Sequence, residues 1–247
     1  MKPSVGLLLL NLLAVIPAAA IAQMSPSSRA AVEAYRASLR ALDALPPGRG
    51  LEVVFTALTS LSDALTHAPA NQPTVLESLS DDEYRQLQRD LPGALINREE
   101  TLYVTADPDF FVRRAATQGD SADRQFFGAL KATRADGVWP VYVEQQTDYS
   151  GCTRFGSGAL VDTYRLWSEF RNRFPRRYTT AARAEEAGVT MALTQSTCAC
   201  GDAASFEQEL RRFLEALPTS PINARIRERL KALREGRSDI RPSCNSG

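Results

Sequence analysis

Apolar residues recur every three or four positions along most of the chain, which is the spacing that places side chains on one face of an α-helix. The first such run ends at Pro46-Pro47-Gly48, and the second ends before Pro69. The apolar positions are Ala31, Val32, Tyr35, Leu39, Leu42 and Leu45 in the first run, and Leu51, Val54, Phe55, Leu58, Leu61 and Leu65 in the second. This pattern predicts a pair of helices within residues 23–70, which we expect to form a helical subregion.

Further helices are indicated by residues that typically begin them. Ser80-Asp81-Asp82-Glu83 has the spacing of a capping box, in which the serine and glutamate side chains pair with free backbone amides. Asp107-Pro108 and Ser220-Pro221 predict two more helix starts. The aspartate or serine side chain can accept hydrogen bonds from the free backbone amides of the first turn, and the proline has no N–H that would be left unpaired. A strong apolar stripe also fills residues 159–174. Together these patterns predict eight or nine helices.

Three short segments instead have the β-branched or alternating pattern that is typical of strands. They are residues 101–105, residues 138–145, where Pro140 restricts the segment to a sheet edge, and residues 189–194. Strands scattered among helices favour an α+β fold over a doubly wound one. The predicted fold class is therefore α+β and mainly α-helical, with a small antiparallel sheet of about three strands.

The beginning of the chain has the pattern of a secretory signal peptide. Lys2 precedes an apolar run over residues 5–16, and Ala20-Ile21-Ala22 supplies the small residues that precede a cleavage site. We predict a signal peptide over residues 1–22, removed after Ala22, and a single mature globular domain over residues 23–247, within which residues 138–247 form a subregion held by disulfides. The apolar run is shorter than the roughly 20 residues that span a bilayer, so we expect no transmembrane segment.

The basic residues are almost all arginine. Only Lys2, Lys131 and Lys231 are lysines among the 29 basic residues, a bias that with the many alanines indicates a GC-rich bacterial genome. Together with the predicted signal peptide, this bias favours the Gram-negative periplasm as the location of the mature protein. Full secretion is the second choice. The formal net charge is zero at pH 7, which gives no overall case for binding nucleic acid.

The charges are nevertheless separated along the chain. Acidic residues predominate over residues 77–123, and basic residues predominate over residues 211–241. One interpretation is that the two regions attract each other within one fold. The other is that a basic C-terminal surface faces an anionic envelope component or an acidic envelope protein.

Four cysteines in an exported protein predict two disulfides. A bridge between Cys198 and Cys200 would close a strained ring, so each is expected to pair with a distant partner, Cys152 or Cys244. If the segment around Cys198 and Cys200 is extended, both side chains point to one face, because the side-chain period of a strand is two. Both pairings stay open at this point. Closing loops of this length would stabilise the fold by about 4 kcal/mol per bridge.

The alternative for these cysteines is a reactive or metal-binding pair. Cys198 and Cys200 could hold Cu(I) together with Met191, or could exchange electrons as thiols. The only histidine, His67, is far away in the sequence, and no other cysteine is near. Structural disulfides are therefore preferred, and no metal or other cofactor is expected.

Arginines alternate with aromatic residues in FRNRFPRRY, residues 170–178. On a helix the aromatic residues fall on the core side, and most of the arginines fall on a solvated face. Arg171, which projects from the apolar stripe, and Arg176 and Arg177, which follow Pro175, are the exceptions. We take these three arginines as candidates for binding a ligand or partner.

The common sets of catalytic residues are missing from the sequence. Zinc sites built on two or three histidines cannot form, because His67 is alone, and it is better explained as an interaction with the end of a helix. Glu99 and Glu100, together with Asp148, are the acidic residues least bound to helices. We therefore predict a non-catalytic binding protein of the bacterial envelope. The alternatives are a hydrolase of envelope polymers that uses carboxylates, and the thiol or copper protein described above.

Overall fold

The computed structural model describes residues 24–147 and 149–244, and the predicted signal peptide lies outside this range. Most of the described residues are helical, which confirms the mainly helical fold class. The helices are α2 (Pro26–Leu42), α3 (Leu51–Thr66), α4 (Val75–Ser78), α5 (Asp81–Asp90), α6 (Pro108–Gln118), α7 (Ser121–Thr133), α8 (Ala159–Arg173), α9 (Thr179–Gln195), α10 (Ala203–Ala216) and α11 (Asn223–Arg234).

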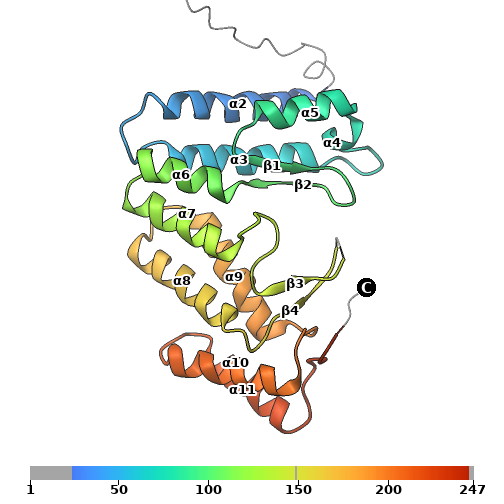
Figure 1. Ribbon diagram of the computed structural model, residues 1–247, viewed down its shortest axis with the longest axis vertical. Helices are drawn as coiled ribbons and strands as arrows, with labels where there is room; N and C mark the ends of the chain where they lie inside the picture. The colour runs from blue at the N-terminus through green and yellow to red at the C-terminus, as the bar shows by residue number, and fades with distance from the viewer. Residues whose placement is uncertain (1–23, 148, 245–247) are drawn as a thin grey trace, which may run out of the picture.

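Helices that follow each other in the chain pack as pairs. The pairs α2–α3, α6–α7, α8–α9 and α10–α11 succeed one another along the long axis of an elongated molecule (Figure 1). Short connections between amphipathic helices favour such pairing, because each helix buries its apolar stripe against its nearest neighbour. The predicted helical pair within residues 23–70 corresponds to α2 and α3.

The strands form two separate antiparallel hairpins instead of one small sheet. Strand β1 (Ala94–Asn97) pairs with β2 (Tyr103–Ala106), and β3 (Val143–Gln145) pairs with β4 (Gly151–Thr153). Both hairpins lie on the same side of the molecule (Figure 1). The turn of the first hairpin and the end of β3 border the candidate site described below.

Two of the predicted strands differ from the structure. Residues 189–194 lie inside α9, where Val189 and Leu193 are one helical turn apart and fully buried. On a helix buried on one side only, residues two positions apart fall on opposite faces, which leaves Met191 56% exposed between the buried Val189 and Leu193. In residues 138–145 only the last three residues form a strand, because the chain turns after Asp136, which accepts the N–H groups of Val138 and Trp139.

The helix starts predicted from capping residues are mostly confirmed. Ser80 and Glu83 form the capping box of α5, and Asp107 caps α6 with Pro108 at its first position. The prediction at Ser220 was wrong. Helix α11 begins at Asn223, whose side-chain amide donates to the carbonyl oxygens of the preceding turn.

Two hydrophobic cores follow each other along the molecule. The first core is formed by α2 to α7 and both strands of the first hairpin, and the second is formed around α10 and α11. Helix α8 contributes Trp167 and Phe170 to the first core and Tyr164 to the second. Helix α9 does the same with Ala182 and Val189. The α8–α9 hairpin therefore joins the two cores.

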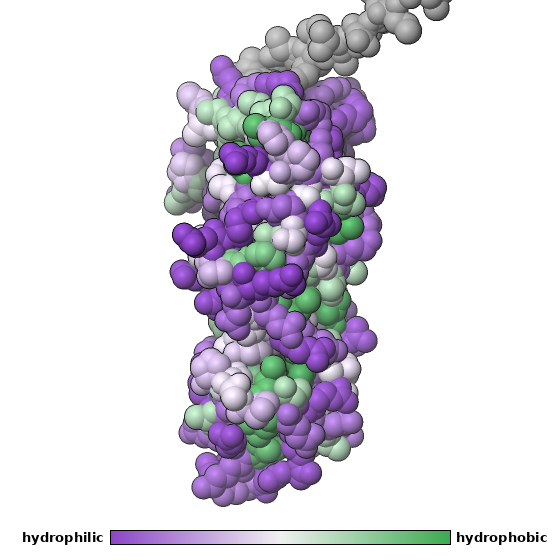
Figure 2. All heavy atoms as spheres, turned by 90° about the vertical axis from the view of Figure 1, so that its left-hand side faces the viewer, coloured by the Kyte–Doolittle hydropathy of each residue, from purple (hydrophilic) through white to green (hydrophobic). Residues whose placement is uncertain are grey.

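The surface offers little apolar area on the side that α6, α7 and α8 form. Figure 2 shows this side, where hydrophilic residues predominate and hydrophobic residues form small, separate groups. A broad exposed apolar patch would mark a protein–protein contact.

Candidate functional site

The four cysteines form two disulfides, Cys152–Cys200 and Cys198–Cys244, with Cα separations of 5.1 and 5.2 Å. The segment that carries Cys198 and Cys200 is extended and lies between strand β4 and the C-terminal tail. Backbone hydrogen bonds join it to Thr153 on one side and to Arg241 on the other. This placement decides the pairing that the sequence left open. Because all four sulfur atoms are bonded, no thiolate is left to bind copper.

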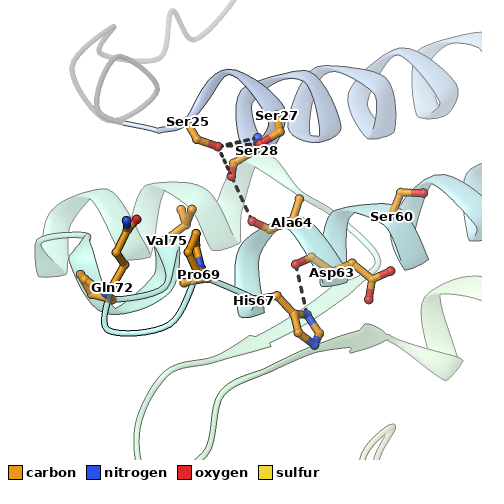
Figure 3. Close-up of a pocket in the computed structure, with 12 residues that line it drawn as sticks. Ser25, Ser27, Ser28, Ser60, Asp63, Ala64, His67, Pro69, Gln72 and Val75 are labelled. Carbon is orange, nitrogen blue, oxygen red and sulfur yellow. Dashed lines mark hydrogen bonds between the residues drawn. The ribbon is translucent and has the colours of Figure 1, made fainter.

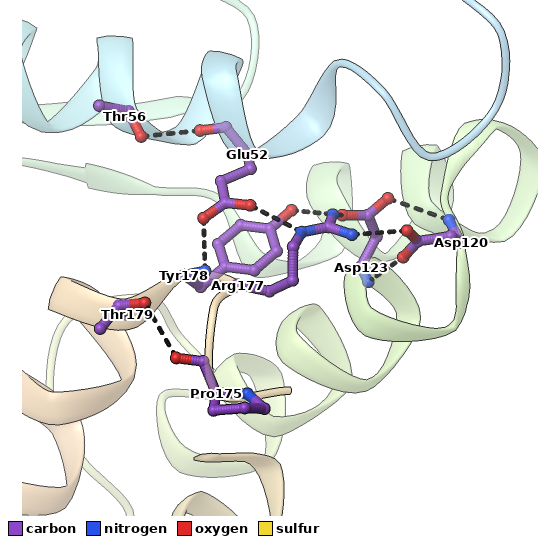
Figure 4. A network of polar contacts seen from close by, with 8 residues as sticks. All are labelled: Glu52, Thr56, Asp120, Asp123, Pro175, Arg177, Tyr178 and Thr179. Atoms are coloured by element: carbon purple, nitrogen blue, oxygen red, sulfur yellow. Dashed lines mark hydrogen bonds and ion pairs between the residues drawn. The ribbon is translucent and has the colours of Figure 1, made fainter. Parts of the chain in front are cut away.

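The three candidate arginines have different surroundings. Arg171 forms an ion pair with Glu186 in the next helix. Arg176 is exposed. Arg177 points inward, and its guanidinium nitrogens lie 2.7 Å from Glu52, 2.6 Å from Asp120 and 2.6 Å from Asp123 (Figure 4). Two of the three side chains are therefore engaged by carboxylates of the protein itself.

The contacts of Arg177 continue through its neighbour Tyr178. The Tyr178 hydroxyl donates to Asp123, its backbone N–H donates to Glu52, and its ring stacks on Phe126 at 3.8 Å. Burial, together with the charge of Asp123, raises the pKa of the Tyr178 hydroxyl. Desolvation opposes the charge of Arg177, but the hydrogen bonds that it donates to Asp120 and Glu52, together with the charge of Asp123, raise its pKa. This network joins α3, α7 and the start of α9 and leaves the guanidinium little capacity for an external anion.

A serine-lined pocket of about 630 Å³ lies between the start of α2 and the end of α3 (Figure 3). Ser28 is buried and donates to the carbonyl oxygen of Ala64 at 3.0 Å. His67 Nδ1 lies 3.2 Å from the carbonyl oxygen of Asp63, which confirms its interaction with the end of the helix. Within the described residues no hydrogen bond joins a serine to His67. A serine nucleophile with a histidine base is therefore not assembled here.

A second cavity, of about 530 Å³, lies between the two β-hairpins. We call it the notch. It is bordered by the turn between β1 and β2, by the loop that follows α7 and by the end of β3. Clefts where two packed bodies meet are frequent binding sites. The residues that line the notch are Asn97, Glu99, Glu100, Thr101, Tyr103, Asp136, Val138, Trp139 and Gln145.

Local hydrogen bonds shape the walls of the notch. Asn97 is paired with Tyr103 at the end of the β1–β2 ladder, and its side-chain amide donates to the carbonyl oxygen of Thr101 at 2.7 Å. On the opposite wall, Asp136 Oδ1 accepts the N–H of Val138 at 2.9 Å and that of Trp139 at 3.2 Å. Both walls are therefore fixed by contacts within their own turns, before any ligand is bound.

The lining of the notch is acidic and aromatic. Glu99, Glu100 and Asp136 are exposed, and among residues 24–147 and 149–244 no arginine or lysine lines the cavity. Tyr103 and Trp139 add partly exposed aromatic rings. Such a combination can stabilise a positive charge and pack against its aliphatic stem.

Sequence reasoning identified only part of the notch. Glu99 and Glu100 were singled out because they are not bound to a helix, whereas Asp148 lies outside the described residues. Tyr103, Asp136 and Trp139 were missed as site residues. The signal in the sequence is Asp136 itself, because an aspartate often accepts the backbone N–H groups two and three residues later. This predicts a turn, but it does not predict which segments of the chain lie beside that turn.

Comparison with known protein families, curated proteins and solved structures finds no match for this chain. Within residues 24–147 and 149–244, no helix combines the length and the apolar character needed to cross a membrane. The same residues contain no group of three histidine, cysteine, aspartate or glutamate side chains placed to hold a metal ion. The two disulfides indicate an oxidising, extracytoplasmic compartment.

Proposed function

We propose that this chain is a non-catalytic binding protein of the bacterial envelope, located in the periplasm or secreted, and that it receives its partner in the notch. The observation that carries the proposal is the cavity itself. Its walls are the β1–β2 turn and the turn at Asp136, both fixed by their own hydrogen bonds, and aromatic, amide and carboxylate side chains line it. Recognition sites typically combine an apolar or aromatic surface with a few oriented polar groups.

The pairing of charges elsewhere in the molecule supports a binding role for the notch. Arg171 and Arg177, two of the three arginines that the sequence indicates as candidates, are engaged by internal carboxylates. In the notch, by contrast, Glu99 and Asp136 face a cavity that no basic side chain of the described residues lines. Carboxylates that face a cavity can be reached by a partner, whereas those engaged by an internal arginine are already neutralised.

A hydrolase that uses the same carboxylates is the second candidate. A carboxylic acid that donates a proton near neutral pH needs a raised pKa, and burial away from water raises the pKa of a carboxyl group. Glu99, Glu100 and Asp136 are all exposed, and this favours recognition over general-acid catalysis.

The proposal is tested by placing a photo-crosslinking amino acid at Thr101, inside the notch, in the protein expressed in its native compartment. The matched control carries the same amino acid at Glu215, an exposed position of α10. We expect a specific adduct from position 101 only, and we expect the captured molecule to keep its mass when incubated with the purified protein. Equal labelling from both positions, or cleavage of the captured molecule, would contradict a non-catalytic role for the notch.

A further inference from the structure

We infer that a second cavity, formed by α3, β2, α9 and the end of α7, binds a small uncharged molecule that carries a primary amide on an apolar body. We call it the α3–α9 cavity, and its volume is about 280 Å³. It shares no lining residue with the notch, so the inference goes beyond the proposed function and does not depend on it. It is carried by a carboxylate oxygen without a partner, by hydroxyl groups that can only accept, and by an apolar wall.

The first feature is the carboxylate of Glu185, a residue of α9 that lines the cavity. Arg134 Nε donates to Glu185 Oε1 at 2.8 Å, whereas Oε2 is buried and has no hydrogen-bond partner among the described residues. A buried carboxylate oxygen without a donor is costly, because it has lost its hydration and gained nothing in return. The last torsion of a glutamate side chain is soft, so a small rotation presents Oε2 to a donor in the cavity. The cavity therefore suits a ligand that donates hydrogen bonds.

The second feature is the set of three hydroxyl groups in the lining, those of Thr59, Ser62 and Thr105. Each has a single proton, and each proton is already used by a backbone carbonyl oxygen. Ser62 donates to Val104 at 2.7 Å, Thr105 donates to Gly137 at 3.0 Å, and Thr59 donates to the preceding turn of its own helix. Only the lone pairs of these oxygens are left. The hydroxyl groups thus ask for donors, as Glu185 does.

The charge of the lining decides between an amide and an ammonium group as the donor. Among the described residues that line the cavity, Arg134 and Glu185 are the only charged ones, and they pair with each other. A charged ligand would add an uncompensated charge beside this neutral pair, which is unfavourable away from water. Arg134 also donates to the carbonyl oxygen of Val138 at 2.6 Å and keeps further N–H groups. A primary amide matches this set, because its NH₂ group donates and its carbonyl oxygen accepts.

The third feature is the apolar part of the wall. Phe55 and Leu58 of α3 and Leu130 of α7 line the cavity, and all three belong to the first hydrophobic core. Binding cavities typically combine such a surface with a few polar groups that fix the orientation of the ligand. A volume of about 280 Å³ is at the lower end for such cavities, which limits the ligand to a body the size of one or two side chains.

The test compares four compounds that share one phenyl-ethyl body, with binding measured by isothermal titration calorimetry and by saturation-transfer NMR. The probe is hydrocinnamamide, a primary amide. Its N,N-dimethyl amide keeps the carbonyl oxygen but has no N–H group, hydrocinnamate carries a negative charge, and the corresponding primary amine carries a positive charge. The protein variants are Glu185→Gln and the matched control Glu186→Gln. The two glutamates have side chains that are 14% and 13% exposed, and each forms one ion pair with an arginine, but only Glu185 lines the cavity.

We expect hydrocinnamamide to bind the unaltered protein, and the other three compounds to bind about ten- to a hundredfold more weakly, as expected when a buried charged acceptor loses its donor. Glu185→Gln should weaken the binding of hydrocinnamamide about tenfold or more, because it removes the charge of the acceptor. Glu186→Gln should leave the binding unchanged.

Three results would overturn the inference. They are the absence of binding by hydrocinnamamide, binding of any comparison compound that is as tight, and an equal loss of affinity in the two variants. The comparison of the four compounds needs no variant, so it decides the matter even if Glu185→Gln does not fold. None of these results bears on the notch, whose own test is the adduct at position 101.

Discussion

The guanidinium of Arg177 lies 2.6 Å from the carboxylate of Asp123, a residue that is completely buried and 54 positions earlier in the chain. A buried carboxylate without a partner is costly, because it loses its hydration without compensation. Arg177 also contacts Glu52 and Asp120, so that one guanidinium holds three carboxylates from two helices. Arg177 is therefore a residue that stabilises the fold.

Replacing Arg177 with alanine should destabilise the protein by about 2–3 kcal/mol. It leaves the buried charge of Asp123 with hydrogen bonds but no counter-charge, although the side chain removed is itself partly exposed. Arg176→Ala, one residue earlier and exposed, is the matched control and should change the free energy of unfolding by less than about 0.5 kcal/mol. Urea denaturation followed by circular dichroism measures both. Similar values for the two variants would show that the network contributes little.

The two disulfides should each contribute about 3–4 kcal/mol, because each closes a long loop in the unfolded chain. The variants to compare are C152S/C200S and C198S/C244S, which each remove one complete bridge. Peptide mapping without reductant checks the connectivity directly. Finding Cys152 joined to Cys198 would contradict the pairing. Free thiols in protein from its native compartment would restore the thiol or copper alternative.

Stability should decline in alkaline solution because of Tyr142. Burial, only partly offset by Arg134, raises the pKa of its hydroxyl to about 12. A tyrosine in the unfolded chain has a pKa near 10. The contribution of Tyr142 to the free energy of unfolding is therefore complete below about pH 10, and it is lost as the pH rises towards the pKa in the folded state. Denaturation midpoints measured between about pH 8 and 12 should fall less steeply in Tyr142→Phe than in the native protein. Parallel curves for the two proteins would assign the alkaline loss to other groups.

The loop that forms one wall of the notch depends on a glycine. Gly137 has a φ of 83°, and a Cβ atom there would lie 2.5 Å from the side chain of Leu95. We expect Gly137→Ala to cost about 1–3 kcal/mol and to weaken binding in the notch, because the backbone conformation is strained and the wall must shift. Gly128→Ala is the matched control, because a Cβ atom meets nothing within 4 Å in the middle of α7. Thermal unfolding of both variants, and photo-crosslinking from position 101 in each, check this prediction.

Local features of this protein could be read from its sequence because they depend on neighbouring residues. The helical pair α2–α3, the capping box at Ser80 and the cap at Asp107 all rest on contacts within a few positions. The pairing of Cys198 and Cys200 with distant cysteines also followed from short-range geometry, since adjacent cysteines of this spacing form a strained ring. Residues 189–194 were misassigned because alternating apolar residues satisfy a strand and a half-buried helix alike.

The tertiary structure decided everything that depends on which distant segments meet. The choice between Cys152 and Cys244 follows from the strand and the tail that flank residues 197–200. Arg177 forms ion pairs with internal carboxylates because the turn between α8 and α9 lies beside α3 and α7. Glu99 and Trp139, 40 positions apart, became one site because the β1–β2 turn and the loop after α7 border the same cavity. The sequence by itself determined the helices and their caps, whereas long-range packing determined where their charged and aromatic side chains converge.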